Sequence, residues 1–124
     1  MEKDYGKIAI IENFNSNGEP TYKLIYNKYS KLPIKKEFYK GGMLNVAIEC
    51  FSKTRYVRKI TKYGFFKEIE EIIQYKKNGR IRTIKTFSGN KMKVDYFDEE
   101  NKVIESEIFT VERYSYNKYF GIDY

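Results

Sequence analysis

The 124-residue sequence contains no histidine and no tryptophan, only one cysteine, and only two prolines. The absence of histidine excludes Ser-His-Asp and Cys-His catalysis, most zinc sites, and the usual general base near neutral pH. No Gly-x-Gly-x-x-Gly and no Gly-Lys-Ser/Thr phosphate loop occurs. The sequence therefore predicts a protein without enzymatic activity, without a cofactor and without a bound metal.

Long apolar runs and a second cysteine are also missing. No run reaches eighteen apolar residues, and the first residues lack the basic and then apolar segments of a signal peptide. Cys50 is alone, so no internal disulfide can form, and it alternates with Leu44, Val46 and Ile48 as a buried structural thiol would. We therefore expect a cytoplasmic protein with no membrane segment.

Two groups of carboxylates deserve comparison with catalytic and metal-binding patterns. Glu105 and Glu107 would share one strand face, as in glycosidic chemistry, and residues 98–100 are all acidic. Neither group has the additional ligands or the glycine-marked loop of a calcium site. A solvated strand face and a solvated turn are the favoured interpretations.

Composition favours β structure in one domain spanning residues 1–124. The chain has 13 Tyr and 9 Phe, whereas Leu and Ala are scarce. Aromatic and β-branched residues fit a pleated, half-buried surface, and Leu and Ala favour helices.

Aromatic residues recur with a twelve-residue spacing. The longest run comprises Tyr39, Phe51, Tyr63, Tyr75 and Phe87, and Asn-Gly, Gly-Gly or similar turn signals follow many of these residues. The spacing predicts an all-β fold, an antiparallel β-meander of about eight to ten short strands in an open curved sheet. An up-and-down barrel is the alternative. The expected strands cover residues 7–13, 21–29, 34–40, 43–51, 55–63, 80–87, 91–97 and 102–113.

Residues 65–77 fit two structures. Apolar residues at 65, 66, 69, 72 and 73 match one face of a helix. A strand is favoured because the segment occupies one unit of the twelve-residue repeat. As a strand it would place Phe65, Ile69, Ile73 and Tyr75 on one side and would need a bulge.

Four segments resemble a known repeat. Residues 75–81 read Tyr-Lys-Lys-Asn-Gly-Arg-Ile, which is similar to the Tyr-x-x-Asn-Gly-x-Ile/Leu signature of MORN-variant repeats, and residues 14–18, 39–44 and 97–104 are looser versions. The resemblance implies β-hairpin repeats in a curved sheet and an interaction scaffold, and one bacterial branch of these proteins is labelled antitoxin. The chain departs from regular MORN repeats because it lacks their Trp and their Gly-x-Gly.

Positive charge is concentrated in the middle of the chain. Residues 53–93 hold thirteen Lys or Arg and three acidic residues, a balance of +10, within a chain of net charge +7. In a meander these strands are neighbours, and we expect their cations to share one end of the sheet as a partner-binding surface that steers acidic partners. The residues of this predicted surface are Lys53, Arg55, Tyr56, Arg58, Lys59, Lys62, Lys76, Lys77, Arg80, Arg82, Lys85, Lys91 and Lys93.

Three functions compete. The leading hypothesis is a protein that inhibits or neutralises a macromolecular partner by occlusion, such as an antitoxin, an immunity protein or a phage-encoded anti-CRISPR, with an acidic protein or a nucleoprotein complex as partner. The second is nucleic-acid or nucleotide binding through residues 53–93. The third is a small-ligand-binding barrel. Residues 114–124 are rich in aromatics and are expected to form a closing strand or a contact segment.

Overall fold

The computed structural model describes residues 2–111, with side chains from residue 6 onward. This part of the chain contains no helix, and therefore none that could cross a membrane. Residues 114–124, expected to close the sheet or to form a contact segment, lie outside the described residues. The ten strands are β1 (Glu2–Tyr5), β2 (Ile8–Phe14), β3 (Pro20–Asn27), β4 (Pro33–Lys40), β5 (Met43–Cys50), β6 (Val57–Tyr63), β7 (Ile69–Tyr75), β8 (Ile81–Ser88), β9 (Lys91–Phe97) and β10 (Val103–Thr110).

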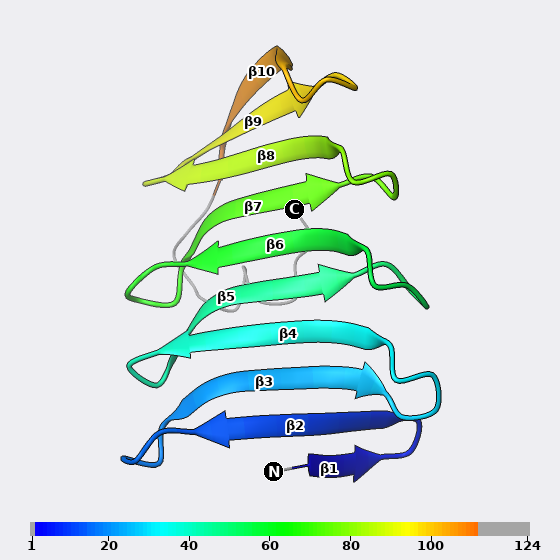
Figure 1. The fold of residues 1–124 in the computed structure, drawn as a ribbon. Coiled ribbons are helices and arrows are strands. Elements are labelled where there is room, and N and C mark those ends of the chain that lie inside the picture. The colour runs from blue at the N-terminus through cyan, green and yellow to red at the C-terminus, as the bar shows by residue number, and fades with distance from the viewer. Residues whose placement is uncertain (1, 112–124) are drawn as a thin grey trace.

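The strands lie side by side in chain order, and each pair of neighbours is antiparallel (Figure 1). The predicted meander is confirmed, and it gains β1, which the aromatic spacing did not predict. Strands β1 and β10 form opposite edges of the described sheet. The barrel alternative is wrong, and the barrel interior on which the small-ligand hypothesis depended is absent from the described chain.

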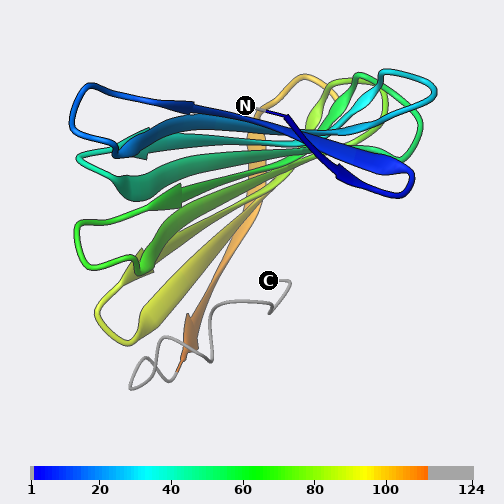
Figure 2. The ribbon, with the colours of Figure 1, turned by 90° about the horizontal axis from the view of Figure 1, so that it is seen from below.

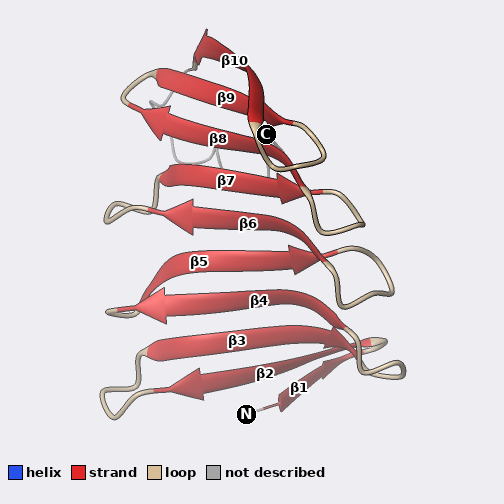
Figure 3. Cartoon of the chain, turned by 45° about the horizontal axis from the view of Figure 1, so that its top comes forward, coloured by secondary structure: helices blue, strands red, loops and turns tan. Residues whose placement is uncertain are grey.

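The sheet is twisted, and its turns alternate between two ends. Seen from below, the strands spread like a fan because each is rotated relative to its neighbour (Figure 2). The turns β1–β2, β3–β4, β5–β6, β7–β8 and β9–β10 lie at one end, and the other turns lie at the opposite end (Figure 3). One strand and its turn take about twelve residues. Residues 24 positions apart in the sequence therefore occupy corresponding places at the same end of the sheet.

Four turns share one backbone geometry. In the turns that begin at residues 15, 64, 76 and 98, the N–H of the first residue donates to the carbonyl of the residue four positions later. The N–H of the residue three positions later donates to the carbonyl of the first residue. This second donor has a positive φ in each turn, and it is Gly18, Lys67, Gly79 or Asn101. Glycine and asparagine tolerate this conformation, which explains the turn signals in the sequence.

Most strand pairs also contain a β-bulge. One extra residue interrupts the register in seven of the pairings, next to a turn. A bulge bends the strand and increases its twist. The extra residues are Thr21, Ile34, Asn45, Arg58, Glu70, Arg82 and Ile104.

The two faces of the sheet differ. One face, which we call the isoleucine face, carries a row of directly paired Ile48, Ile60, Ile73 and Ile84, all half-buried. The other, the buried face, carries Ala47, Thr61, Ile72 and Val94, each at most 4% exposed. Cross-strand pairs of this kind contribute about 0.2–1 kcal/mol each, and they fix the register of the sheet.

Within residues 65–77, residues 69–75 form strand β7 and the residues on either side are turns, so the helix alternative is wrong. Strand β7 pairs with β6 and β8 along its length. The expected bulge is present at Glu70, but it places Ile69 on the side of Ile72 and Phe87 instead of the side of Ile73. Ile69, Ile72 and Phe87 form the main apolar cluster of the described residues.

Candidate binding surface

Three consecutive turns at one end of the sheet carry positive charge only. The turns β3–β4 (residues 28–32), β5–β6 (residues 51–56) and β7–β8 (residues 76–80) contain no Asp and no Glu. We call these three turns the basic end. Its cations are Lys28, Lys31, Lys53, Arg55, Lys76, Lys77 and Arg80.

Two bulges add arginines beside these turns. Arg58 and Arg82 are the extra residues of the β5–β6 and β7–β8 pairings, at corresponding positions 24 residues apart. The Arg58 guanidinium donates to Glu49 Oε1 at 3.2 Å, and Lys59 Nζ lies 3.5 Å from Glu49 Oε2. Glu49 thus neutralises at most one of two adjacent cations. Within residues 6–111, Lys53 and Arg55 form no ion pair at all.

An acidic turn borders the basic end. Glu99, in the β9–β10 turn, accepts from Lys76 Nζ at 2.6 Å and from Asn78 Nδ2 at 3.4 Å. The hydrogen bond and the charge of Lys76 lower the pKa of Glu99. The side chain of Asn101 also accepts from the N–H of Ile81 at 2.9 Å. These contacts hold the β7–β8 and β9–β10 turns together and mark where the basic end stops.

Aromatic rings are exposed among the cations. Tyr29 is 73% exposed in the β3–β4 turn, and Tyr56 is 64% exposed in the β5–β6 turn. Lys31 Nζ lies 5.8 Å from the centre of the Tyr26 ring, and Lys77 Nζ lies 5.9 Å from that of Phe51. Both distances are within the range of a cation–π attraction.

A hollow of about 620 Å³ opens in the basic end. Lys53, Arg58 and Lys77 line it together with Phe51 and Cys50. Burial raises the pKa of the Cys50 thiol, although the charge of Lys36 partly opposes this. The neutral thiol is a poor nucleophile. Cys50 is, however, only half-buried and lines the hollow, so the expectation of a buried thiol is wrong.

The structure gathers only part of the predicted surface. Eight of the thirteen predicted residues lie at the basic end, and these are Lys53, Arg55, Tyr56, Arg58, Lys76, Lys77, Arg80 and Arg82. The expectation that all thirteen share one end is wrong for the other five. Each strand runs from one end of the sheet to the other. Residues in its middle or at its other end therefore lie far from the turn that precedes it.

Three of these five lysines lie within the sheet. Lys59 is 8% exposed and is paired with Glu49. Lys62 lies toward the opposite end and is paired with Glu71 at 3.1 Å. Lys85 is half-buried beside Ile72.

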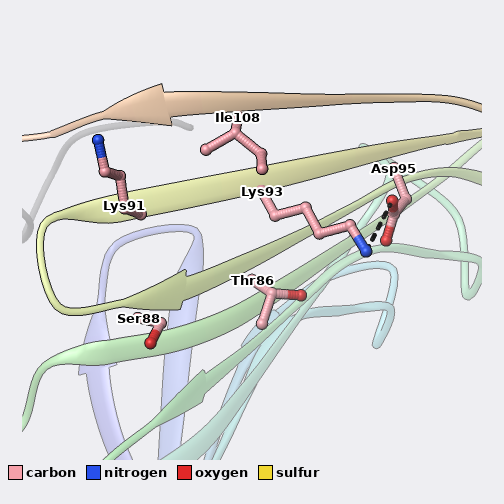
Figure 4. Close-up of a pocket in the computed structure, with 6 residues that line it drawn as sticks. All are labelled: Thr86, Ser88, Lys91, Lys93, Asp95 and Ile108. Carbon is pink, nitrogen blue, oxygen red and sulfur yellow. Dashed lines mark ion pairs between the residues drawn. The ribbon is translucent and has the colours of Figure 1, made fainter.

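The remaining two, Lys91 and Lys93, lie near the β8–β9 turn at the opposite end. They line a separate hollow of about 460 Å³ with Asp95 and Ile108 (Figure 4). Lys93 Nζ is 3.7 Å from Asp95, and Lys91 Nζ donates to Thr110 Oγ1 at 2.9 Å. These lysines stabilise strands β9 and β10 instead of extending the basic end.

Sequence reasoning missed three residues of the basic end. Lys28, Tyr29 and Lys31 lie in the β3–β4 turn, outside the charge-rich segment 53–93. The twelve-residue spacing, doubled to 24 residues, aligns Lys31 with Arg55 and so contained a signal for Lys31. Lys28 aligns with Ser52 and had no such signal.

Comparison with known proteins gives a fold and no family. No family model matches the chain, and no curated protein matches it. The fold resembles part of a solved chain in the crystal structure of a GtfA/B complex bound to UDP and GlcNAc, with 14% identity and a TM-score of 0.51. The match covers 90% of this chain and 24% of that chain. At this identity the likeness shows the fold alone, and the MORN-variant resemblance stays a prediction.

The described residues contain no group of His, Cys, Asp or Glu side chains that could hold a metal ion. Glu105 and Glu107 instead lie on an exposed edge strand, and Glu107 accepts a hydrogen bond that raises the pKa of Tyr96. What the described part of the chain offers a partner is a charged, partly aromatic surface.

Proposed function

We propose that this chain is a non-enzymatic binding protein that neutralises an acidic macromolecular partner by covering it with the basic end. The observation that carries the proposal is the set of three consecutive turns with seven cations and no acidic residue. Such a surface attracts an acidic partner over a distance and orients it before contact.

The hydrogen bonding of the turns supports the same function. Bulges and repeated hydrogen-bond patterns fix the backbone on which the cations are mounted. A surface that is ordered before binding loses less conformational entropy on association. An acidic protein, such as a nuclease or another effector that is blocked by occlusion, is the partner that we favour.

Two charge-reversal variants with the same net charge test this proposal. In the first, Lys53, Arg55 and Arg80 of the basic end are each replaced by Glu. In the second, the exposed residues Lys40, Lys67 and Lys91, all away from the basic end, are replaced by Glu. Each immobilised protein is exposed to lysate of the organism that carries the gene, and retained proteins are identified by mass spectrometry.

We expect an acidic protein that is retained by the wild type and by the second variant, but not by the first. Once purified, that protein should form a complex with the wild type and lose its activity in it. Retention of the same proteins by both variants contradicts a role of the basic end, and a complex with full partner activity contradicts inhibition.

Nucleic acid is the second candidate because of the exposed rings of Tyr29 and Tyr56. Alternating cations and exposed aromatic rings form the usual surface for single strands, on which each stacked base contributes about 1–3 kcal/mol. Fluorescence anisotropy with a labelled oligothymidine should show binding that weakens steeply with salt. Tyr29→Ala and Tyr56→Ala should each reduce the affinity, and Tyr22→Ala, away from the basic end, should not. Salt-independent or absent binding excludes this candidate.

A further inference from the structure

The hollow in the basic end combines cationic and apolar surface. Lys53 and Arg58 from the β5–β6 hairpin and Lys77 from the β7–β8 turn supply three positive charges. Leu32 and Ile34 of the β3–β4 hairpin supply an apolar side. Three consecutive hairpins therefore contribute to one cavity.

The charge in this cavity is only partly balanced. The Glu49 carboxylate contacts Arg58 and also the buried Lys59. Lys53 has no ion pair within the described residues, and Lys77 faces the Phe51 ring instead of an acid. An anion entering here meets an excess of cations.

The apolar side of the cavity is exposed to solvent. Ile34 is 40% exposed although it is a large aliphatic residue, because the β-bulge leaves it without a partner on strand β3. Pro33 and Phe51 lie beside it in the lining. A ligand that covers these groups removes apolar surface from water, which is favourable.

We propose that this hollow is a binding site for a phosphate ester with an apolar or aromatic organic part, of which a nucleotide is the representative class. The phosphate lies against Lys53, Arg58 and Lys77, and the organic part lies against Ile34 and Phe51. The volume of about 620 Å³ is within the range of roughly 300–1,000 Å³ typical of small-molecule sites. This site goes beyond the proposed function, which concerns a macromolecular partner.

Cys50 provides a direct test, because it lines the hollow and is the chain's only cysteine. The rate at which N-ethylmaleimide modifies the half-buried Cys50 is measured at about pH 8, where a thiol of raised pKa still reacts slowly. Adenosine monophosphate, adenosine, inorganic phosphate and a five-nucleotide oligoadenylate are the probes. Isothermal titration calorimetry measures the affinity of each probe independently.

We expect adenosine monophosphate to slow the modification and adenosine to have little effect. If the natural ligand is a nucleotide within a nucleic-acid strand, the oligoadenylate protects Cys50 better than adenosine monophosphate. If the natural ligand is a free nucleotide, adenosine monophosphate protects better than the oligoadenylate. Both orders support the site. Equal protection by adenosine and adenosine monophosphate overturns the phosphate contact, and no protection by any probe overturns the site.

Matched variants separate this cavity from the general charge of the basic end. Lys53→Gln and Lys77→Gln remove cations that line the hollow, and each should weaken binding of adenosine monophosphate about tenfold, as loss of a charged hydrogen bond does. Lys31→Gln and Arg55→Gln remove exposed cations of the same end that do not line it. A urea unfolding transition with the wild-type midpoint shows that a variant is folded.

Equal weakening by all four substitutions overturns the specific site and leaves only a diffuse attraction. The capture experiment on the macromolecular partner uses a different probe and a different readout. Failure of the nucleotide site therefore leaves the proposed function standing, and the reverse also holds.

Discussion

Arg58 and Glu49 are joined by a 3.2 Å contact although Arg58 has no directly opposed residue on strand β5. The bulge turns the arginine toward the carboxylate, and the other oxygen of that carboxylate holds Lys59 at 3.5 Å. One acid therefore contacts a cation beside the basic end and a buried cation of the sheet.

The first prediction follows from this shared contact. Glu49→Gln should lower the free energy of unfolding by about 1–3 kcal/mol, because Lys59 is 8% exposed and loses its carboxylate. Arg58→Gln should cost less, because its side chain is 37% exposed. Urea unfolding of both variants measures the difference, and an equal or reversed order contradicts this assignment.

The second prediction compares neighbouring isoleucines on opposite faces of strand β7. Ile72 is 1% exposed and Ile73 is only half-buried. Ile72→Ala should therefore cost about 2–5 kcal/mol, the usual loss for a fully buried aliphatic side chain. Ile73→Ala should cost clearly less. The same denaturation assay decides, and a larger loss at Ile73 would show that the isoleucine face is the one covered in solution.

The third prediction concerns Gly79, which has a φ of 88° in the β7–β8 turn. An added methyl group would meet no atom within 4 Å, so only the backbone conformation penalises a larger residue. Gly79→Ala should destabilise the protein by about 1–2 kcal/mol. Lys77→Ala in the same turn is the control and should have little effect on thermal unfolding. A neutral Gly79→Ala would mean that the turn relaxes to another geometry.

The fourth prediction is a pH dependence. Burial, together with the charge of Glu37 and a 3.1 Å hydrogen bond to it, raises the pKa of Tyr39 from 10.0 to about 12. The folded chain then holds a proton that the unfolded chain releases near pH 10, so stability falls as the pH rises between these two values. Tyr39→Phe should show a shallower fall in urea midpoint over that window.

The control for this pH series is Tyr29→Phe, which removes an exposed phenol. Its pH profile should follow that of the wild type. Identical profiles for wild type and Tyr39→Phe would show that the phenol and Glu37 are not in contact in solution.

The sequence by itself determined most of the secondary structure of this protein, with strand β1 and the choice between helix and strand at β7 as the exceptions. Alternating aliphatic and aromatic residues, with an aromatic at each strand end and a turn residue after it, restrict the chain locally to short strands. Because sequential strands pair when their turns are tight, this local information also specified the order of the sheet. At β7 the helix-like spacing of Ile69, Ile72 and Ile73 competed, and pairing with β6 and β8 decided for the strand.

Only the tertiary structure decided which charges gather at the basic end and which pair within the sheet. A count of charges along the chain does not record at which end of a strand each residue lies. It also does not record where a β-bulge moves the following side chains to the other face of the sheet. Thus Lys59 and Lys62 entered the predicted surface but pair with Glu49 and Glu71, whereas Lys28 and Lys31, distant in sequence, belong to it. Strand-by-strand register, which depends on bulges that amino-acid patterns specify weakly, brings Lys53 and Lys77 to one hollow.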